Sequence, residues 1–174
     1  MGLIEHLEAR LGTITGGRRH DGFQVAAFGS GWFATIGLSH HHLTSRTSGR
    51  HLRLELLAGG RPAEFLPGLL GQVADELLAS GEALLRGDVI GPRGPLVPGS
   101  RMAAWYAAIP VYQDDGFAAA DLPDGARAAI VWLVPISAAE AAYVRSHGWK
   151  AFEDELVRHD PDLLDLGRAE LPVC

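Results

Sequence analysis

The stretch VWLVPISAAEAAYVRSHGW, residues 131–149, holds the junction that decides the fold. Its first four residues are apolar and β-prone, which is typical of a short strand buried on both faces in the middle of a sheet. Pro135 has no backbone N–H to donate, so we expect it to end the hydrogen-bonded ladder. Within three residues the pattern then changes from the period of a strand to that of a helix.

The helix after this strand has a start signal of its own. Ser137 and Glu140 fit the capping box S-x-x-E, in which each side chain accepts a hydrogen bond from a backbone N–H at the helix start. We expect a helix over residues 138–147 that Gly148 ends, and a second helix over residues 149–159 that ends before a proline. Because the cap occupies its hydroxyl, Ser137 is predicted to be structural and is a weak candidate for a nucleophile.

Strand patterns recur across the rest of the chain. Strands are predicted on both sides of a Gly-Ser-Gly turn and in three later segments, namely 23–28, 32–39, 52–57, 103–109 and 129–134. The last three are expected to be adjacent or nearly adjacent in one sheet. In the segment 52–57, leucines alternate with Arg53 and Glu55, so this strand is expected to be half-buried.

Apolar stripes predict two further helices. One covers residues 3–11, and the other runs from Pro62, or more properly from near Pro67, to Gly81. Residues 91–100 contain three prolines and three glycines and are predicted to form a loop. Together these segments indicate one α+β domain, with a mixed, mostly antiparallel sheet and helices packed on it.

The composition is that of a globular protein. The chain has 174 residues, of which 47% are apolar and 21% charged, and this fits a single domain with a real core. The net charge of −6 argues against a general affinity for nucleic acid. No stretch has the pattern of a secretory signal or a membrane span, and the one cysteine, Cys174, allows no internal disulfide and no zinc cluster. We expect a cytoplasmic protein that does not bind a membrane; its oligomeric state is left open.

Acidic residues gather in the second half of the chain. Residues 1–64 carry seven arginines against five acids, whereas residues 113–174 carry twelve acids against four arginines and Lys150. Both an ordinary solvated face and a surface that meets a basic partner fit this pattern, and the second would speed encounter through its field. If the acids form an interface, we expect it where they fall on turns and short helices, at Asp114, Asp115, Asp121, Asp124, Glu153, Asp154 and Glu155.

Short motifs that could carry chemistry each have a simpler explanation. The segment GSGWFA at 29–34 matches a dinucleotide-binding fingerprint, but a strand follows it instead of a helix, so we expect a tight turn and no cofactor. His40 and His42 would share one face of a strand but lack an obvious third ligand, so we expect no metal. The tripeptide RGD at 86–88 is interpreted as a chance match. No catalytic residue is predicted.

Three segments, taken in order, resemble those of the Suppressor of fused-like domain in its bacterial single-domain form. They are FATIGLS (33–39), LVPGSRMAAWYAAIPVY (96–112) and VWLVPISAAEAAYVRSHGWKAFEDEL (131–156), and the closing ELPVC (170–174) fits the same pattern. The resemblance covers residues 22–174, which leaves residues 1–21 as an N-terminal helix and lead-in. One departure is Asp88 in RGDVIG, where the family often has a Gly-His pair.

The resemblance implies a protein-binding fold with no catalytic residue to carry over. Animal members hold a transcription factor by β-strand addition and acidic contacts, and bacterial members are inferred to be immunity proteins that neutralise toxins of neighbouring cells. We therefore expect a non-enzymatic protein-binding domain, most concretely an immunity protein for a basic toxin. The alternatives are a scaffold for another cellular protein and, in a different class, a small enzyme with a dispersed His and Asp site.

Overall fold

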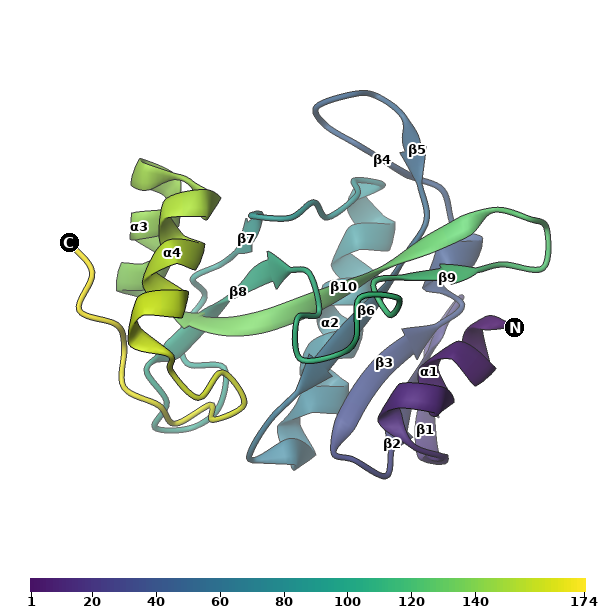
Figure 1. The fold of residues 1–174 in the computed structure, drawn as a ribbon, viewed down its shortest axis with the longest axis horizontal. Helices are drawn as coiled ribbons and strands as arrows, with labels where there is room; N and C mark the ends of the chain where they lie inside the picture. Colours follow the sequence, from purple (N-terminus) through teal and green to yellow (C-terminus); the bar gives the residue numbers. More distant parts are fainter.

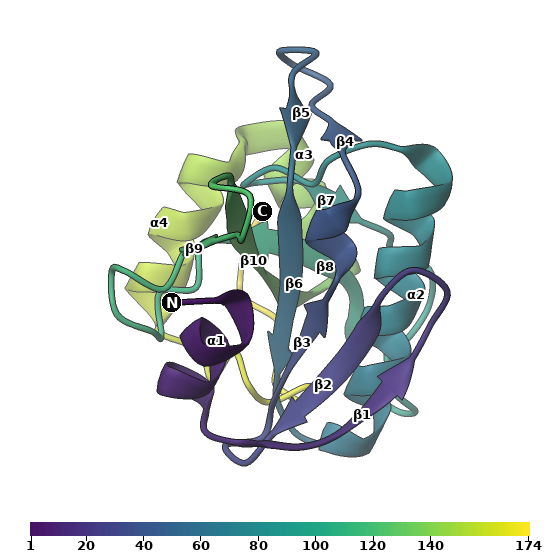
Figure 2. The ribbon, with the colours of Figure 1, turned by 90° about the vertical axis from the view of Figure 1, so that its right-hand side faces the viewer.

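The computed structural model describes all of residues 1–174 and arranges them as a sheet with helices on both faces (Figure 1). Figure 2 shows helix α2 (Leu66–Ser80) on one face, with α1 (Leu3–Leu11), α3 (Ala138–His147) and α4 (Trp149–His159) on the other. The strands are β1 (Ile14–Arg19), β2 (Gln24–Phe28), β3 (Trp32–Ile36), β4 (Leu43–Thr44), β5 (His51–Leu52), β6 (Leu54–Gly59), β7 (Val89–Ile90), β8 (Met102–Ala108), β9 (Ala119–Asp121) and β10 (Arg127–Ser137). Two short 3-10 helices are η1 (Leu38–His40) and η2 (Ala63–Phe65).

Strand β10 lies at the centre of the main sheet, as the apolar start of the 131–149 stretch predicts. The strand order is β1-β2-β3-β6-β10-β8-β7, and the short β9 also pairs with β10. β10 runs parallel to β6, with Val131 opposite Leu56, and antiparallel to β8, with Val134 opposite Tyr106. The three segments predicted to be neighbours are therefore adjacent. The sheet is mixed and mostly antiparallel, which confirms the predicted α+β fold.

Each face of the sheet has its own apolar core. Leu70 of α2 packs in one core, and Leu7 of α1 and Phe152 of α4 pack in the other. Because successive side chains of a strand point to opposite faces, β10 contributes Leu133 to the first core and Trp132 to the second. The central strand is thus buried on both faces.

The prediction that Pro135 ends the ladder is wrong. β10 continues to Ser137, and Pro135 lies opposite Trp105 of β8. β6 pairs with β10 only as far as Trp132, and beyond that point the carbonyl of Pro135 accepts a hydrogen bond of 3.0 Å from Arg168. The nitrogen and the carbonyl of one residue in an antiparallel strand point to the same side, so the missing N–H costs no bond to β8.

The strand predicted over residues 32–39 ends early. β3 stops at Ile36, because Gly37 adopts a left-handed conformation with φ of 102° and the 3-10 turn η1 follows. The N–H groups of Gly37 and Ser39 each donate to the carboxylate of Glu55 at 3.0 Å. The side chain of Glu55, on the neighbouring strand β6, therefore stabilises a turn that the local sequence does not predict.

The segment 52–57 also departs from the half-buried strand that alternation predicts. It divides at Arg53 into β5 and β6, and every residue of β6 is buried, including Glu55. β6 lies between β3 and β10 inside the sheet, and the two cores cover its faces, with Leu56 in one core and Leu57 in the other. The buried carboxylate is satisfied in part by Thr35, whose hydroxyl donates to it at 2.6 Å.

The other predicted elements are confirmed with small refinements. α2 begins at Leu66 with Pro67 in its first turn and ends at Gly81, where φ is 71°. Residues 29–31 form the expected turn between β2 and β3, and residues 122–126 form the turn between β9 and β10. α1 and β1 join the same cores and sheet as the rest, although the domain boundary at residue 21 stays a prediction. No helix combines the length and the apolar character needed to cross a bilayer.

Candidate functional site

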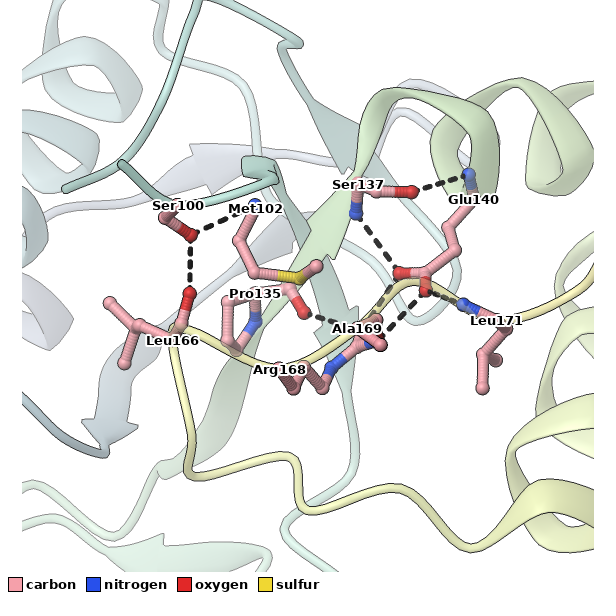
Figure 3. Close-up of polar contacts among 9 residues, drawn as sticks. All are labelled: Ser100, Met102, Pro135, Ser137, Glu140, Leu166, Arg168, Ala169 and Leu171. Atoms are coloured by element: carbon pink, nitrogen blue, oxygen red, sulfur yellow. Dashed lines mark hydrogen bonds and ion pairs between the residues drawn. The ribbon is translucent and has the colours of Figure 1, made fainter. Parts of the chain in front are cut away.

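The junction between β10 and α3 is closed by a complete capping box (Figure 3). The hydroxyl of Ser137 accepts the N–H of Glu140 at 3.1 Å, and the carboxylate of Glu140 accepts the N–H of Ser137 at 3.0 Å. Ser137 is only 1% exposed, so its hydroxyl is out of reach of a substrate. The predicted structural role of Ser137 is confirmed.

A buried ion pair joins this junction to the C-terminal segment. The guanidinium of Arg168 donates from Nη1 and Nη2 to the two oxygens of Glu140, both at 2.8 Å. Glu140 also accepts the N–H of Leu171 at 2.7 Å, and Arg168 reaches the carbonyl of Pro135. Figure 3 shows this segment crossing the end of β10 with Arg168 directed at Glu140. Because both charges are paired and hydrogen-bonded, they can remain ionised away from water.

A second contact holds the same C-terminal segment. Ser100, in the loop before β8, donates from its hydroxyl to the carbonyl of Leu166 and accepts the N–H of Met102 at 2.9 Å (Figure 3). We call the two contacts, through Glu140–Arg168 and Ser100–Leu166, the C-terminal clamp. Every side-chain nitrogen and oxygen of the clamp except Nε of Arg168 makes a hydrogen bond within the protein, so the junction between β10 and α3 is structural.

The two histidines predicted to share a strand face do not do so. His40 ends η1, and His42 lies beyond it, where its Nε2 accepts a hydrogen bond from Arg53 at 3.0 Å. No three of the His, Cys, Asp and Glu side chains are placed where they could hold a metal ion together. The one serine–histidine hydrogen bond joins the neighbours Ser146 and His147 at the exposed end of α3. That the protein works without metal or cofactor stays a prediction.

A groove lies between α4 and the chain that follows β8. Tyr106, Trp132 and Val134 of the central strands form its floor, residues 109–112 form one bank, and α4 with residues 160–163 forms the other. In Figure 1 the chain after β8 crosses in front of the sheet, between α4 on the left and α1 on the right. We call this hollow of about 210 Å³ the α4 groove.

Exposed apolar side chains are concentrated at this groove. Eight large apolar side chains of the molecule are exposed, and four of them line the α4 groove: Ile109, Val111, Tyr112 and Val157. Val111 is 68% exposed and Val157 is 82% exposed. A fifth, Trp149, lies against Arg86 on the rim. Single exposed apolar residues are ordinary, but a gathering of them marks an interaction surface.

A polar cluster forms one wall of the α4 groove. Arg86 pairs with the carboxylate of Glu153 through Nε at 3.1 Å and through Nη2, and its guanidinium lies 4.3 Å from the ring centre of Trp149. The hydroxyl of Tyr106 donates to Glu153 at 2.8 Å. The bond to Glu153 raises the pKa of Arg86, and burial together with the same carboxylate raises the pKa of Tyr106 well above its ordinary value. Arg86 therefore stays cationic and Tyr106 neutral, which makes this cluster a fixed wall.

Asp160 is an acid of the α4 groove that has no ion-pair partner. It lies at the C-terminal end of α4 in the left-handed conformation, with φ of 43°. Burial raises the pKa of the Tyr112 hydroxyl, and the charges of Asp162 and Asp160 raise it further. Asp162 itself pairs with Arg61. The field in the groove is therefore negative on the side of residues 160–162.

The seven acids predicted for partner binding fall into two groups, and six of them are paired. Asp115 alone has no ion-pair partner; the pairs are Asp114 with Arg10 (3.2 Å), Asp121 with Arg127 (3.3 Å), Asp124 with Arg53 (2.6 Å), Glu153 with Arg86, Asp154 with Lys150 (3.3 Å) and Glu155 with Arg158 (2.8 Å). Asp114, Asp115, Asp121 and Asp124 form the turn group, and Glu153 is the one acid of the seven that lines the α4 groove. Hydrogen bonds from the Ala126 N–H and from Arg53 lower the pKa of Asp124. Because six of these seven acids are paired with cations, the surface is less negative than the number of acids in the sequence implies.

A second hollow, of about 750 Å³, adjoins the α4 groove. It is lined mainly by apolar residues, and Arg53 and Arg127 also border it. The two hollows share Arg86, Ala108 and Ile109. Arg53 and Arg127 are paired with acids of the turn group, so these acids determine the net charge at the edge of the second hollow.

The family model of the Suppressor of fused protein (SUFU) matches residues 18–169. The chain belongs to the Suppressor of fused family. The match takes in the sheet from the end of β1 onward, helices α2, α3 and α4, and all four residues of the C-terminal clamp. The family resemblance of the sequence is thereby confirmed. No curated protein sequence matches the chain significantly.

Solved structures of the family have the same fold. A Suppressor of fused homologue from Neisseria gonorrhoeae FA 1090 superposes with a TM-score of 0.67 at 17% identity, over 95% of this chain and 92% of that chain. The Sufu-Fu complex gives 0.72 at 15% identity, over 97% and 90%. Drosophila Suppressor of Fused gives 0.62 at 17% identity, over 84% of this chain and 39% of that one. At sequence identities of 15–17%, the structural similarity to these proteins shows a shared fold alone.

The departure from the family pattern at Asp88 has a structural role in this chain. The carboxylate of Asp88 accepts the N–H of Leu85 at 2.8 Å and pairs with Arg46 at 2.9 Å. It thereby closes the turn that carries Arg86 into the wall of the α4 groove. An aspartate that bonds back to a nearby backbone N–H is the usual chemistry of such turns.

Sequence reasoning does not single out the α4 groove. β8 ends at Ala108, and the apolar residues Val111 and Tyr112 fall in the loop that follows it. Pro110 is the signal that could have shown this, because a proline removes a ladder donor. Val157 is the other signal, since it lies on the polar side of the amphipathic helix α4, where an apolar residue has no core to join.

Proposed function

We propose that this chain is a non-enzymatic protein-binding domain, and more specifically an immunity protein that acts in the cytoplasm by neutralising a toxin. The observation that carries the proposal is the α4 groove, where exposed apolar side chains gather beside acidic groups. Protein interfaces combine an apolar centre with a polar rim in this way. One relative with the same fold was solved as a complex with another protein, the Sufu-Fu complex, which supports the general role.

A basic toxin domain is the partner chemistry that fits best. The chain carries a net charge of −6, and its acids are concentrated in residues 113–174. Toxins that act on nucleic acid are themselves basic, because their substrate is a polyanion. An acidic inhibitor meets such a partner faster through complementary charge, and it neutralises the toxin by contact without a reaction of its own.

Growth of a bacterial host gives the direct test. The proposal requires a toxin gene near the gene for this chain; its basic domain is produced from an inducible promoter, alone and together with this chain. We expect the chain to restore growth and to form a complex with the toxin on gel filtration. A complex that leaves growth inhibited would support a scaffold instead, and the absence of both effects would contradict the proposal.

The role of the turn group can be measured separately through association rates. Changing Asp114, Asp115, Asp121 and Asp124 to Asn removes four charges without placing a lysine against Arg10, Arg53 or Arg127. We expect slower association at low salt and a flatter salt dependence, with little change in dissociation. The matched control removes four exposed acids elsewhere, by the changes Glu5→Gln, Asp21→Asn, Glu64→Gln and Asp75→Asn. Equal rates for the two variants would show that only net charge matters and that the turn group is solvated surface.

A further inference from the structure

We propose that the α4 groove takes a segment of the partner in which one large apolar side chain stands beside a lysine or arginine. This inference rests on the proposed protein-binding function and adds the chemistry of the segment that is bound. It is argued from the size of the groove, the side chains that border it and the charges on its banks.

The size of the groove favours a single side chain as its occupant. Its volume is about 210 Å³. Pockets that enclose small molecules commonly measure roughly 300–1,000 Å³, so the groove is small for a metabolite or a cofactor. A single aromatic or large aliphatic side chain, carried by a protein segment, matches this space better.

The floor of the groove is suited to an apolar anchor. Trp132 is 1% exposed and packs against Tyr112, with ring centres 4.8 Å apart, and against Trp32, at 5.9 Å. The wall formed by Arg86, Glu153 and Tyr106 is fixed by hydrogen bonds. A pocket that is already ordered loses little conformational entropy on binding, which is what an anchor residue at the centre of an interface requires.

The charges on the banks favour a basic residue beside the anchor. Asp160 lies at the groove without a cation, and Glu153 and Asp162 stand near it. Arg86 is the one cation that lines the groove, and it is already paired with Glu153. The cation that the groove lacks is the one opposite Asp160, and a lysine or arginine of the partner can supply it.

The same charges disfavour a second copy of this chain as the occupant. In a symmetric dimer the same patch meets itself, so the acidic bank of one groove would face that of the other. Like charges brought together across an interface are unfavourable. A partner of opposite charge removes this conflict.

Selection of peptides on the full-length chain tests the inference. Random short peptides displayed on phage are selected on the immobilised protein, and enriched sequences are made with a fluorescent label and titrated by anisotropy. We expect enriched peptides to share Trp, Phe, Tyr or Leu within a residue or two of Lys or Arg. Val157→Asp should weaken their binding by about tenfold or more, because it places a charge beside the anchor. Asp160→Asn should weaken it by about twofold to fivefold and flatten its salt dependence.

Phe65→Asp is the matched control, since Phe65 is also a large exposed apolar residue but lies on η2, away from the groove. Val157 is 82% exposed, so its substitution should leave the fold intact, which an unfolding curve checks. No enriched peptide, enrichment without basic residues, or equal loss of binding in Phe65→Asp would overturn the inference. A concentration-dependent dimer in sedimentation that Val157→Asp abolishes would overturn it as well, because the occupant would then be a second copy.

The growth test separates this inference from the proposed function. If the wild-type chain restores growth and the Val157→Asp variant does so equally well, the assignment of the groove is wrong while the immunity function stands. If selected peptides bind in the groove but the wild-type chain does not restore growth, the toxin role fails while the assignment of the groove stands.

Discussion

Arg168 and Glu140 form a bidentate ion pair in the interior, with both hydrogen bonds at 2.8 Å and side-chain exposures of 4% and 0%. The pair ties the C-terminal segment to the first turn of α3 and to the end of β10. It places one charge of each sign in a region that excludes water, so neither can be removed alone without leaving the other unpaired.

Removal of one partner of this pair should destabilise the domain strongly. We expect Arg168→Met or Glu140→Gln to lower the free energy of unfolding by about 3–5 kcal/mol each, and the double variant to lose less than the sum of the two. Denaturant titration of the four proteins gives the coupling energy. The control is Glu170→Gln, which breaks an exposed pair with Arg101 in the same segment and should cost about 0–1 kcal/mol. Additive losses would show that the pair is not coupled.

Loss of the helix cap at Ser137 should have a smaller effect. Ser137→Ala removes the acceptor of the Glu140 N–H, and we expect the free energy of unfolding to fall by about 1 kcal/mol. Ser146→Ala, at the exposed end of α3, removes a hydroxyl of the same helix without uncapping it and should change stability by less than about 0.5 kcal/mol. Identical melting curves for wild type and Ser137→Ala would argue against the cap.

Glu55 should make stability depend on pH. Burial raises its pKa above the ordinary value of 4.5, although hydrogen bonds from Ser39, Thr35 and Gly37 oppose the shift. Below pH 4.5 both the folded and the unfolded chain hold the proton, so no penalty arises. As pH rises above 4.5 the unfolded chain loses its proton first, and stability falls until pH passes the folded pKa.

The variant Glu55→Gln imitates the protonated acid and removes this dependence. We expect its free energy of unfolding, relative to wild type, to increase from pH 4.5 upward and to level off at high pH. Parallel denaturation curves across the pH range measure this difference. Glu64→Gln serves as the control for the loss of a surface carboxylate. A difference that stays constant with pH would show that Glu55 titrates alike in the folded and unfolded chain.

Gly87 should be intolerant of any side chain. Its φ is 90°, and a Cβ added there would lie 2.5 Å from the Cβ of Trp149. Gly94 is a matched control, since its φ is 89° but a Cβ there would meet nothing within 4 Å. Both changes to Ala cost about 1–2 kcal/mol for the left-handed backbone, and only Gly87→Ala should cost more, because Trp149 must move. Equal losses of unfolding free energy in the two variants would contradict the close packing.

The parts of the fold that the sequence predicts are those governed by local rules. The capping box at Ser137, the stop at Gly81 and the buried strand at 131–134 each depend on a few neighbouring residues, and each is confirmed. The prediction for Pro135 is wrong because it counts only the lost donor. Which side of the strand that donor would have faced is set by the register with β8, where Pro135 lies opposite Trp105, 30 positions earlier.

The candidate site is harder to predict from the sequence, because it too depends on contacts between residues that are far apart along the chain. Glu55 resembles the polar half of an alternating strand until Thr35 of β3 and the turn at η1 surround its carboxylate. The acids of residues 113–174 suggest an open negative surface, but their cations come from distant segments, as with Asp124 and Arg53, 71 positions apart. The α4 groove exists only because α4 and residues 109–112 stand side by side. The two banks come from different stretches of the chain, so neither stretch by itself predicts the groove.

The C-terminal clamp also imposes an order in time. During synthesis Glu140 emerges well before residues 168–171, so the start of α3 lacks its cation until those residues are made. β6 likewise waits for β10, a partner that follows about 75 residues later. Pairings so distant along the chain form slowly, because a long loop must close before any contact repays it. We therefore expect a nascent chain stalled before Arg168 to remain open to proteolysis, and the domain to become resistant only once residues 168–171 are free to pair.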